Sequence, residues 1–127
     1  MRIGVSLYDD LLGQAAASER KRMHYDLRTS PEEGSMRMLN ALQPDTKIPI
    51  HRHNDTSESV FVLKGIVEEV LFDNQGNELE RVRLTVGEGC QVSKAQYHTA
   101  IALVPSVIVE FKDGMYDPDT TEDIWRG

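Results

Sequence analysis

The 127-residue sequence predicts an all-β domain, a double-sheet jelly roll preceded by one short helix. Three observations support this fold class. Short runs rich in β-branched and aromatic residues follow one another from residue 36 onward. Turn signals rich in glycine, asparagine and aspartate separate these runs. Only the first 30 residues carry apolar side chains at near-helical spacing.

The N-terminal segment predicts a single helix over residues 8–21. Leu11 and Leu12 recur with three alanines at near-helical spacing. Asp9 and Asp10 favour a helix start, because negative charge stabilises the amino end of the helix dipole. We therefore expect this helix to be the only one in the chain.

A basic run at residues 19–22 follows the predicted helix. Cationic side chains complement the carboxyl end of a helix dipole, so we interpret the run as a solvated helix end, with a lid over a ligand pocket as the alternative. A turn cluster then closes the segment. This divides the chain into an N-terminal helical segment, residues 1–34, packed on the barrel, and a single domain, residues 35–127.

Eight strands are predicted in the second segment, and eight short strands in a chain of this size suggest two packed sheets. The loop at residues 73–77 is the clearest hairpin turn. The acidic tail, residues 115–127, carries Trp125, which we interpret as an anchor on the barrel or on a second subunit. The predicted strands are residues 36–42, 47–53, 58–63, 66–72, 79–84, 89–93, 99–103 and 106–112.

Composition excludes several classes of partner. The net charge is −7, and the basic residues form no long run, which argues against nucleic acid and anionic membranes as partners. The single cysteine forms no internal disulfide, and no apolar run approaches the length of a membrane span. We therefore expect a cytoplasmic protein. We interpret Cys90 as a small buried side chain rather than a nucleophile.

The stretch from His51 to Glu58 gathers side chains that ligate metals. His51 and His53 are two residues apart, so on a strand both imidazoles point to the same face. A loop at residues 54–57 lets Glu58 return beside them. Two imidazoles and a carboxylate suit a borderline divalent cation.

A further nitrogen ligand can come from one of the two remaining histidines. His98 lies in a region dense in predicted strands that can fold back onto the first motif, whereas His24 lies in a polar, basic segment. We therefore predict His98 as the fourth ligand. One divalent ion per chain is expected, and the ligand set does not distinguish zinc, iron, manganese, nickel or copper.

These residues resemble the two motifs of the cupin superfamily. His51, His53, Glu58 and Gly65 keep the spacing of the first motif, and only its leading glycine is replaced, by Asp45. The resemblance implies a cupin jelly-roll barrel whose metal ligands are the three histidines and the glutamate.

The second motif is less complete. Gly87 and His98 match the motif, whereas Ser93, Ala95 and Ala102 replace its proline, second glycine and asparagine. These losses affect turn geometry and packing more than ligation, so the metal-ligand set stays intact.

Several runs are similar to the WbuC-type small cupin metalloproteins, and the similarity spans about residues 20–118. These runs are residues 35–44, 49–53, 56–58 and 110–114. Members of that family are often encoded among surface-polysaccharide genes. The family's reaction is not established, so the resemblance suggests a sugar or sugar nucleotide as the small polar metabolite but no reaction. A metal that acts as a Lewis acid permits isomerisation, epimerisation or hydrolysis, so we expect a metal-dependent enzyme, isomerase- or epimerase-like.

Two alternatives stay open. Other cupins with a similar ligand set are iron-dependent dioxygenases, and a non-catalytic module that binds or senses a small ligand would need the same site. The similar cupins are commonly dimers and a sandwich leaves sheet edges, so we expect a homodimer.

Three further side chains are predicted to bind the ligand: Asn40, Lys112 and Arg37. Asn40 shares a strand face with apolar neighbours, so its amide either closes a core hydrogen bond or lines a pocket. Lys112 shares a face with Glu110, with which a surface ion pair is the simpler interpretation. Arg37 has the opposite parity to Asn40 and points outside that cavity unless a bulge intervenes. No catalytic residue can be assigned from the sequence.

Overall fold

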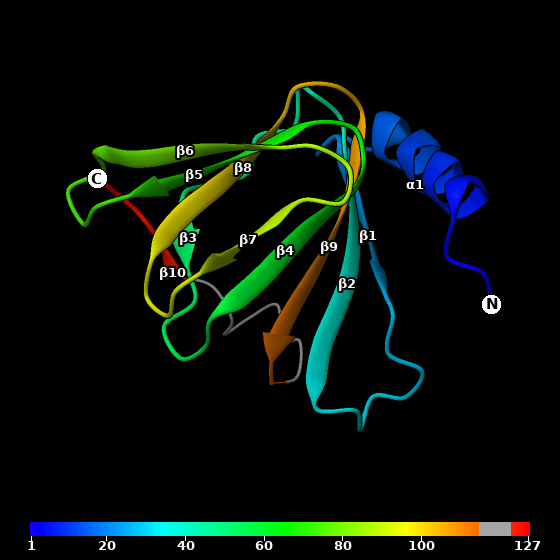
Figure 1. Ribbon diagram of the computed structural model, residues 1–127, viewed down its shortest axis with the longest axis horizontal. Coiled ribbons are helices and arrows are strands. Elements are labelled where there is room, and N and C mark those ends of the chain that lie inside the picture. Colours follow the sequence, from blue (N-terminus) through cyan, green and yellow to red (C-terminus); the bar gives the residue numbers. More distant parts are fainter. Residues whose placement is uncertain (115–122) are drawn as a thin grey trace.

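The computed structural model describes residues 1–114 and 123–127. Two antiparallel sheets of five strands each pack against one another, and one helix lies on the outside of the first sheet (Figure 1). The elements are α1 (Val5–Ala17), β1 (Arg22–Asp26), β2 (Ser35–Leu42), β3 (His51–Arg52), β4 (Glu58–Lys64), β5 (Val67–Phe72), β6 (Glu78–Leu84), β7 (Gly89–Val92), β8 (Tyr97–Ala102), β9 (Ser106–Asp113) and β10 (Asp123–Ile124).

The first sheet has the order β1-β2-β9-β4-β7, and the second has the order β10-β3-β8-β5-β6. The predicted all-β jelly roll with a short N-terminal helix is confirmed. Each predicted strand is present, although the run at residues 47–53 is strand only at His51–Arg52. Pro49 explains part of this difference, because proline has no N–H to donate to a ladder.

The N-terminal segment differs from its prediction. The helix is Val5–Ala17 rather than residues 8–21, because the backbone is already extended at Ser18. The chain turns at Lys21, which has a φ of 58°, and then forms β1, which the sequence did not predict. β1 pairs with β2 along its whole length, so this part of residues 1–34 belongs to the first sheet. The division of the chain at residue 34 stays a prediction.

The apolar core has two parts, one on each face of the first sheet. The inner part lies between the sheets and joins Leu42 and Val62 of one sheet to Val67 and Leu84 of the other. The outer part lies under α1, where helix side chains such as Leu11 pack on β2 and β9. The alternation along β2 and β9 therefore buries both faces of their central region, which fixes which residues face the space between the sheets.

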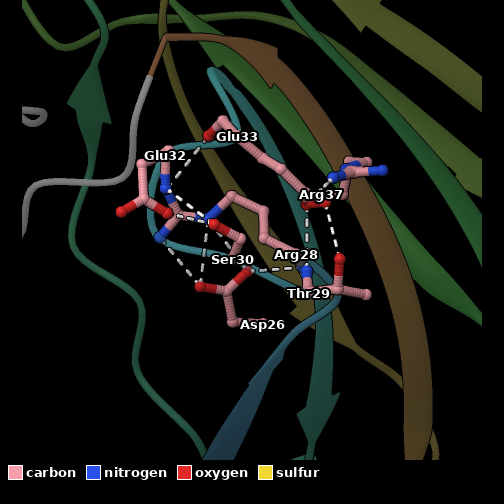
Figure 2. A network of polar contacts seen from close by, with 7 residues as sticks. All are labelled: Asp26, Arg28, Thr29, Ser30, Glu32, Glu33 and Arg37. Atoms are coloured by element: carbon pink, nitrogen blue, oxygen red, sulfur yellow. Dashed lines mark hydrogen bonds and ion pairs between the residues drawn. The ribbon is translucent and has the colours of Figure 1, made fainter.

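Ion pairs and hydrogen bonds hold the connection between β1 and β2 (Figure 2). Arg28 Nη2 lies 2.9 Å from Asp26 Oδ2, and Glu33 Oε2 accepts from the backbone N–H of Thr29 at 2.9 Å. Arg37 extends from β2 to the same Glu33, with 2.5 Å between Nη2 and Oε2. This network ties the end of β1 to the start of β2.

The predicted tail lies partly outside the described residues. Of its described part, Trp125 contacts the barrel: its backbone N–H donates to Ile50 O at 2.9 Å, and its indole N–H donates to Asn74 O at 3.4 Å. The predicted anchoring of Trp125 on the barrel is therefore confirmed. In the described ranges, no helix is both long and apolar enough to cross a membrane.

Candidate metal centre

Three histidines from the second sheet meet one glutamate from the first. His51 on β3 lies directly opposite His98 on β8, because the two strands pair in that register. His53 follows β3, and Glu58 begins β4 on the facing sheet. The fold thus brings together all four residues that the sequence predicted as ligands, and His24 is not among them.

The imidazoles form one compact cluster. Ring centroids are 4.4 Å apart for His51 and His98, 5.3 Å for His51 and His53, and 6.0 Å for His53 and His98. One nitrogen from each ring lies within 4.8 Å of the other two, and Glu58 Oε2 lies 3.3 Å from His53 Nε2. Ligands about 2.1 Å from one ion lie roughly 3–4 Å from each other, so the three imidazoles are close to the spacing that one cation requires, and Glu58 lies beside His53.

Each imidazole uses its Nδ1 atom for a partner outside the cluster. His51 Nδ1 lies 2.8 Å from Pro49 O, His98 Nδ1 lies 2.5 Å from Glu69 Oε1, and His53 Nδ1 lies 3.2 Å from Lys112 Nζ. Metal-binding histidines usually donate their other N–H to an oxygen acceptor, as the contacts of His51 and His98 allow, and this fixes the ring orientation. The three Nε2 atoms are consequently the nitrogens placed to bind a cation, and the residues fit a metal ion.

The pKa values of the two carboxyl groups at the centre, those of Glu58 and Glu69, are shifted in opposite directions. Burial opposes ionisation of Glu58, but its hydrogen bond with His53 and the charges of the three histidines outweigh that effect, so the pKa of Glu58 lies below its usual range. Burial and the charge of Glu58 raise the pKa of Glu69 well above its usual range. Glu58 is therefore the carboxylate suited to bind a cation, while Glu69 is suited to orient His98.

A cavity of about 380 Å³ opens beside the histidines. Asn40 and Lys112, two of the predicted ligand-binding residues, line it. Lys112 is 7% exposed and contacts His53, so it lies buried at the cavity and not on the surface, where the sequence suggested an ion pair with Glu110. Asn40 Nδ2 instead donates to Glu110 Oε1 at 3.0 Å.

Arg37 does not line this cavity. It lies on the opposite face of β2, as its parity predicted, and contacts Glu33. A role for Arg37 in ligand binding stays a prediction. Cys90 is not poised as a nucleophile, because burial and nearby carboxylates raise the pKa of its thiol to about 12.

The sequence analysis did not place Glu69 or Glu110 in the site. Glu69 orients His98, and Glu110 lines the cavity beside Asn40. One signal was available for Glu69: Glu68 and Glu69 are adjacent on one predicted strand, so one of them had to face inward.

The basic run at residues 19–22 is not a helix end, because α1 ends at Ala17; its Arg20 and Arg22 line the cavity, as the alternative interpretation of this run placed them. His24, which was weighed only as a metal ligand, lines the cavity as well. For the basic residues the signal was the polar–apolar alternation of residues 22–26, which is typical of a strand but was not interpreted as one.

Solved structures with the same fold are only distantly related in sequence. KdgF from Halomonas sp. matches with 19% identity and a TM-score of 0.62, over 76% of this chain and 82% of that one. The capsular polysaccharide assembling protein CapF from Staphylococcus aureus matches with 16% identity and a TM-score of 0.72, over 87% and 31%. Oxalate oxidase in complex with the substrate analogue glycolate matches with 14% identity and a TM-score of 0.69, over 85% and 57%.

At such low identity these likenesses show the fold alone, and this chain spans less than two thirds of CapF and of oxalate oxidase. They establish that the two sheets form a cupin jelly roll. The sequence matches no curated protein significantly. A family model matches residues 3–84, which is more than half of the chain. The chain therefore belongs to the family described as Domain of unknown function (DUF6016).

Proposed function

We propose that His51, His53, His98 and Glu58 bind one divalent metal ion, and that the protein is a metal-dependent enzyme acting on a small polar metabolite. The observation that carries the proposal is the cluster of three imidazoles, in which the Nδ1 atoms of His51 and His98 each lie within hydrogen-bond distance of an oxygen acceptor. Such orientation is typical of metal-binding histidines. A bound ion would supply Lewis-acid polarisation of a ligand oxygen.

The chain itself supplies groups that can position a ligand and move a proton. Asn40 holds Glu110 through Oε1, which leaves Oε2 as the atom that can give or take a proton in the cavity. Burial and the charges of Glu58 and Glu69 raise the pKa of Glu110 well above its usual range, which brings it toward the pH range where acid–base catalysis operates. Isomerisation or epimerisation would require such a group.

Lys112 supplies a cation beside the histidines. A neutral His53 that binds metal through Nε2 carries its proton on Nδ1, so this nitrogen no longer accepts a hydrogen bond from the Lys112 ammonium at 3.2 Å. We therefore expect Lys112 to turn toward an anionic or hydroxylated ligand once metal is bound. Ligand binding should then depend on metal.

The WbuC-type resemblance favours a sugar or sugar nucleotide as the metabolite, in surface-polysaccharide metabolism. CapF, whose name describes a capsular polysaccharide assembling protein, has the same fold and is consistent with that setting. A homodimer is proposed on the same resemblance.

A thermal-shift screen of sugar phosphates, nucleotide sugars and hydroxy acids tests this function. A ligand at a hundred times its dissociation constant adds about 2.7 kcal/mol to the free energy of unfolding. We expect hits that require metal and that weaken in Lys112→Ala and Asn40→Ala, with Arg37→Ala testing the remaining predicted residue. Hits indifferent to metal removal and to the first two substitutions would contradict the proposed site, and binding without turnover of any hit would favour a non-catalytic module.

A further inference from the structure

The unpredicted strand β1 brings basic side chains to the cavity. In the antiparallel pair of β1 and β2, Arg22 lies opposite Leu42, and His24 lies opposite Asn40. Directly opposed residues of an antiparallel pair project to the same face of the sheet. Leu42 and Asn40 face the space between the sheets, so Arg22 and His24 face it as well, and both line the cavity that His51 and His53 also line.

The other face of β1 explains why this orientation is fixed. Met23 and Tyr25 alternate with the basic residues and pack on the apolar cluster under α1. A slip of the strand by one residue would expose these apolar side chains and bury the basic ones under the helix. The helix thus sets the register that aims Arg22 and His24 at the cavity.

Hydrogen bonds tie Arg22 to the segment that leads to His51. Its Nη1 donates to Thr46 Oγ1 at 3.3 Å and to Lys47 O at 3.2 Å. The segment that begins there continues to Pro49, whose carbonyl oxygen contacts His51 Nδ1. Arg20, just before β1, lines the same cavity. Two arginines and a histidine therefore gather on one side of the cavity in a chain whose net charge is −7.

We propose that Arg20, Arg22 and His24 form an anion subsite for the phosphate or carboxylate of a ligand whose other end presents oxygen donors to the histidine cluster. This inference rests on the proposed function and narrows its substrate class. Arginine recognises phosphate and carboxylate through paired N–H donors, and a cavity of about 380 Å³ is large enough for a phosphorylated metabolite.

Two matched pairs of probes test the subsite by calorimetric titration of the metal-containing protein. Glycerate and 3-phosphoglycerate share a 2-hydroxy acid end and differ in a distal phosphate, whereas lactate and malate differ in a distal carboxylate. We expect 3-phosphoglycerate to bind at least about tenfold more tightly than glycerate, or malate to do so relative to lactate, or both. The pair with the larger difference in affinity shows whether the subsite prefers phosphate or carboxylate. The double substitution Arg20→Ala with Arg22→Ala should abolish most of this gain and leave glycerate and lactate binding unchanged.

The control is Arg83→Ala, since Arg83 lies on β6 and pairs with Glu68 away from the cavity. Arg22→Lys should restore part of the gain, which separates charge recognition from loss of the Thr46 and Lys47 contacts. The subsite is rejected if neither 3-phosphoglycerate nor malate binds at least twofold more tightly than its matched probe. It is also rejected if this gain in affinity persists in the double variant. A protein that lacks metal by elemental analysis but still shows the arginine-dependent gain in affinity would contradict the metal site. That result would support the anion subsite.

Discussion

Replacing Glu69 by glutamine should weaken metal binding without disturbing the fold. Glu69 Oε1 lies 2.5 Å from His98 Nδ1, and both side chains are less than 5% exposed, so water cannot replace the lost charge. Loss of such a supporting carboxylate typically lowers metal affinity 10–100-fold, which is about 1.4–2.7 kcal/mol. The burial of this contact favours the middle or upper part of that range.

This loss can be read from the melting temperature. At a metal concentration of a hundred times the dissociation constant, binding adds about 2.7 kcal/mol, and a 30-fold weaker site retains about 0.9 kcal/mol. For a domain of this size the metal-dependent rise in Tm should fall from about 11 °C to about 3–4 °C. Metal affinity is measured in parallel by competition with a chelating dye.

The adjacent Glu68 provides a matched control. It lies on the same strand but faces outward, where it pairs with Arg81 and Arg83. Glu68→Gln should leave metal affinity unchanged. The metal-free Glu69→Gln protein should be at least as stable as the parent at pH 7, because a carboxyl whose pKa is raised in the folded state costs stability once it ionises. Equal metal affinity in parent and Glu69→Gln, or equal losses in both variants, would refute the reasoning.

Three further predictions concern acidity and assembly. Metal should dissociate as pH falls below roughly 6, because imidazoles must be neutral to ligate; retention at pH 4.5 by elemental analysis after dialysis would contradict this. The pKa of Glu110 is raised in the folded state, so its contribution to stability is lost as pH rises. Metal-free Glu110→Gln should therefore exceed the parent in urea midpoint at pH 8, with the difference vanishing toward pH 4. Light scattering should report a homodimer at micromolar concentration, and a monomer across that range would reject it.

The second part of the chain was predictable because its strands are short apolar runs bounded by turn residues. In β2, Asn40 shares the parity of Met36, Met38 and Leu42, and all four line the cavity. Lys112 lines it as well, although the sequence favoured a surface position. The spacing of His51, His53 and Glu58 predicted that these residues converge, and they do. Local periodicity carried this information, so no long-range pairing had to be known.

The first part of the chain was predicted wrongly because its strand signal is short. β1 alternates polar and apolar residues over only five positions, directly after a helical pattern, and its pairing with β2 and packing on α1 make it a strand. Tertiary contacts override weak propensity in such a case. The inward direction of Glu69 rather than Glu68 likewise depends on the register of β5 with β8, which the sequence does not specify.

The content of metal in natively purified protein tests the central claim most directly. We expect about one divalent ion per chain by elemental analysis, and loss of most of it in His53→Ala and in His98→Ala, because each removes one nitrogen of the cluster. His24→Ala, which removes the histidine outside the cluster, should keep the full content. Stoichiometric metal in both cluster variants, or no metal in the parent protein, would contradict the account.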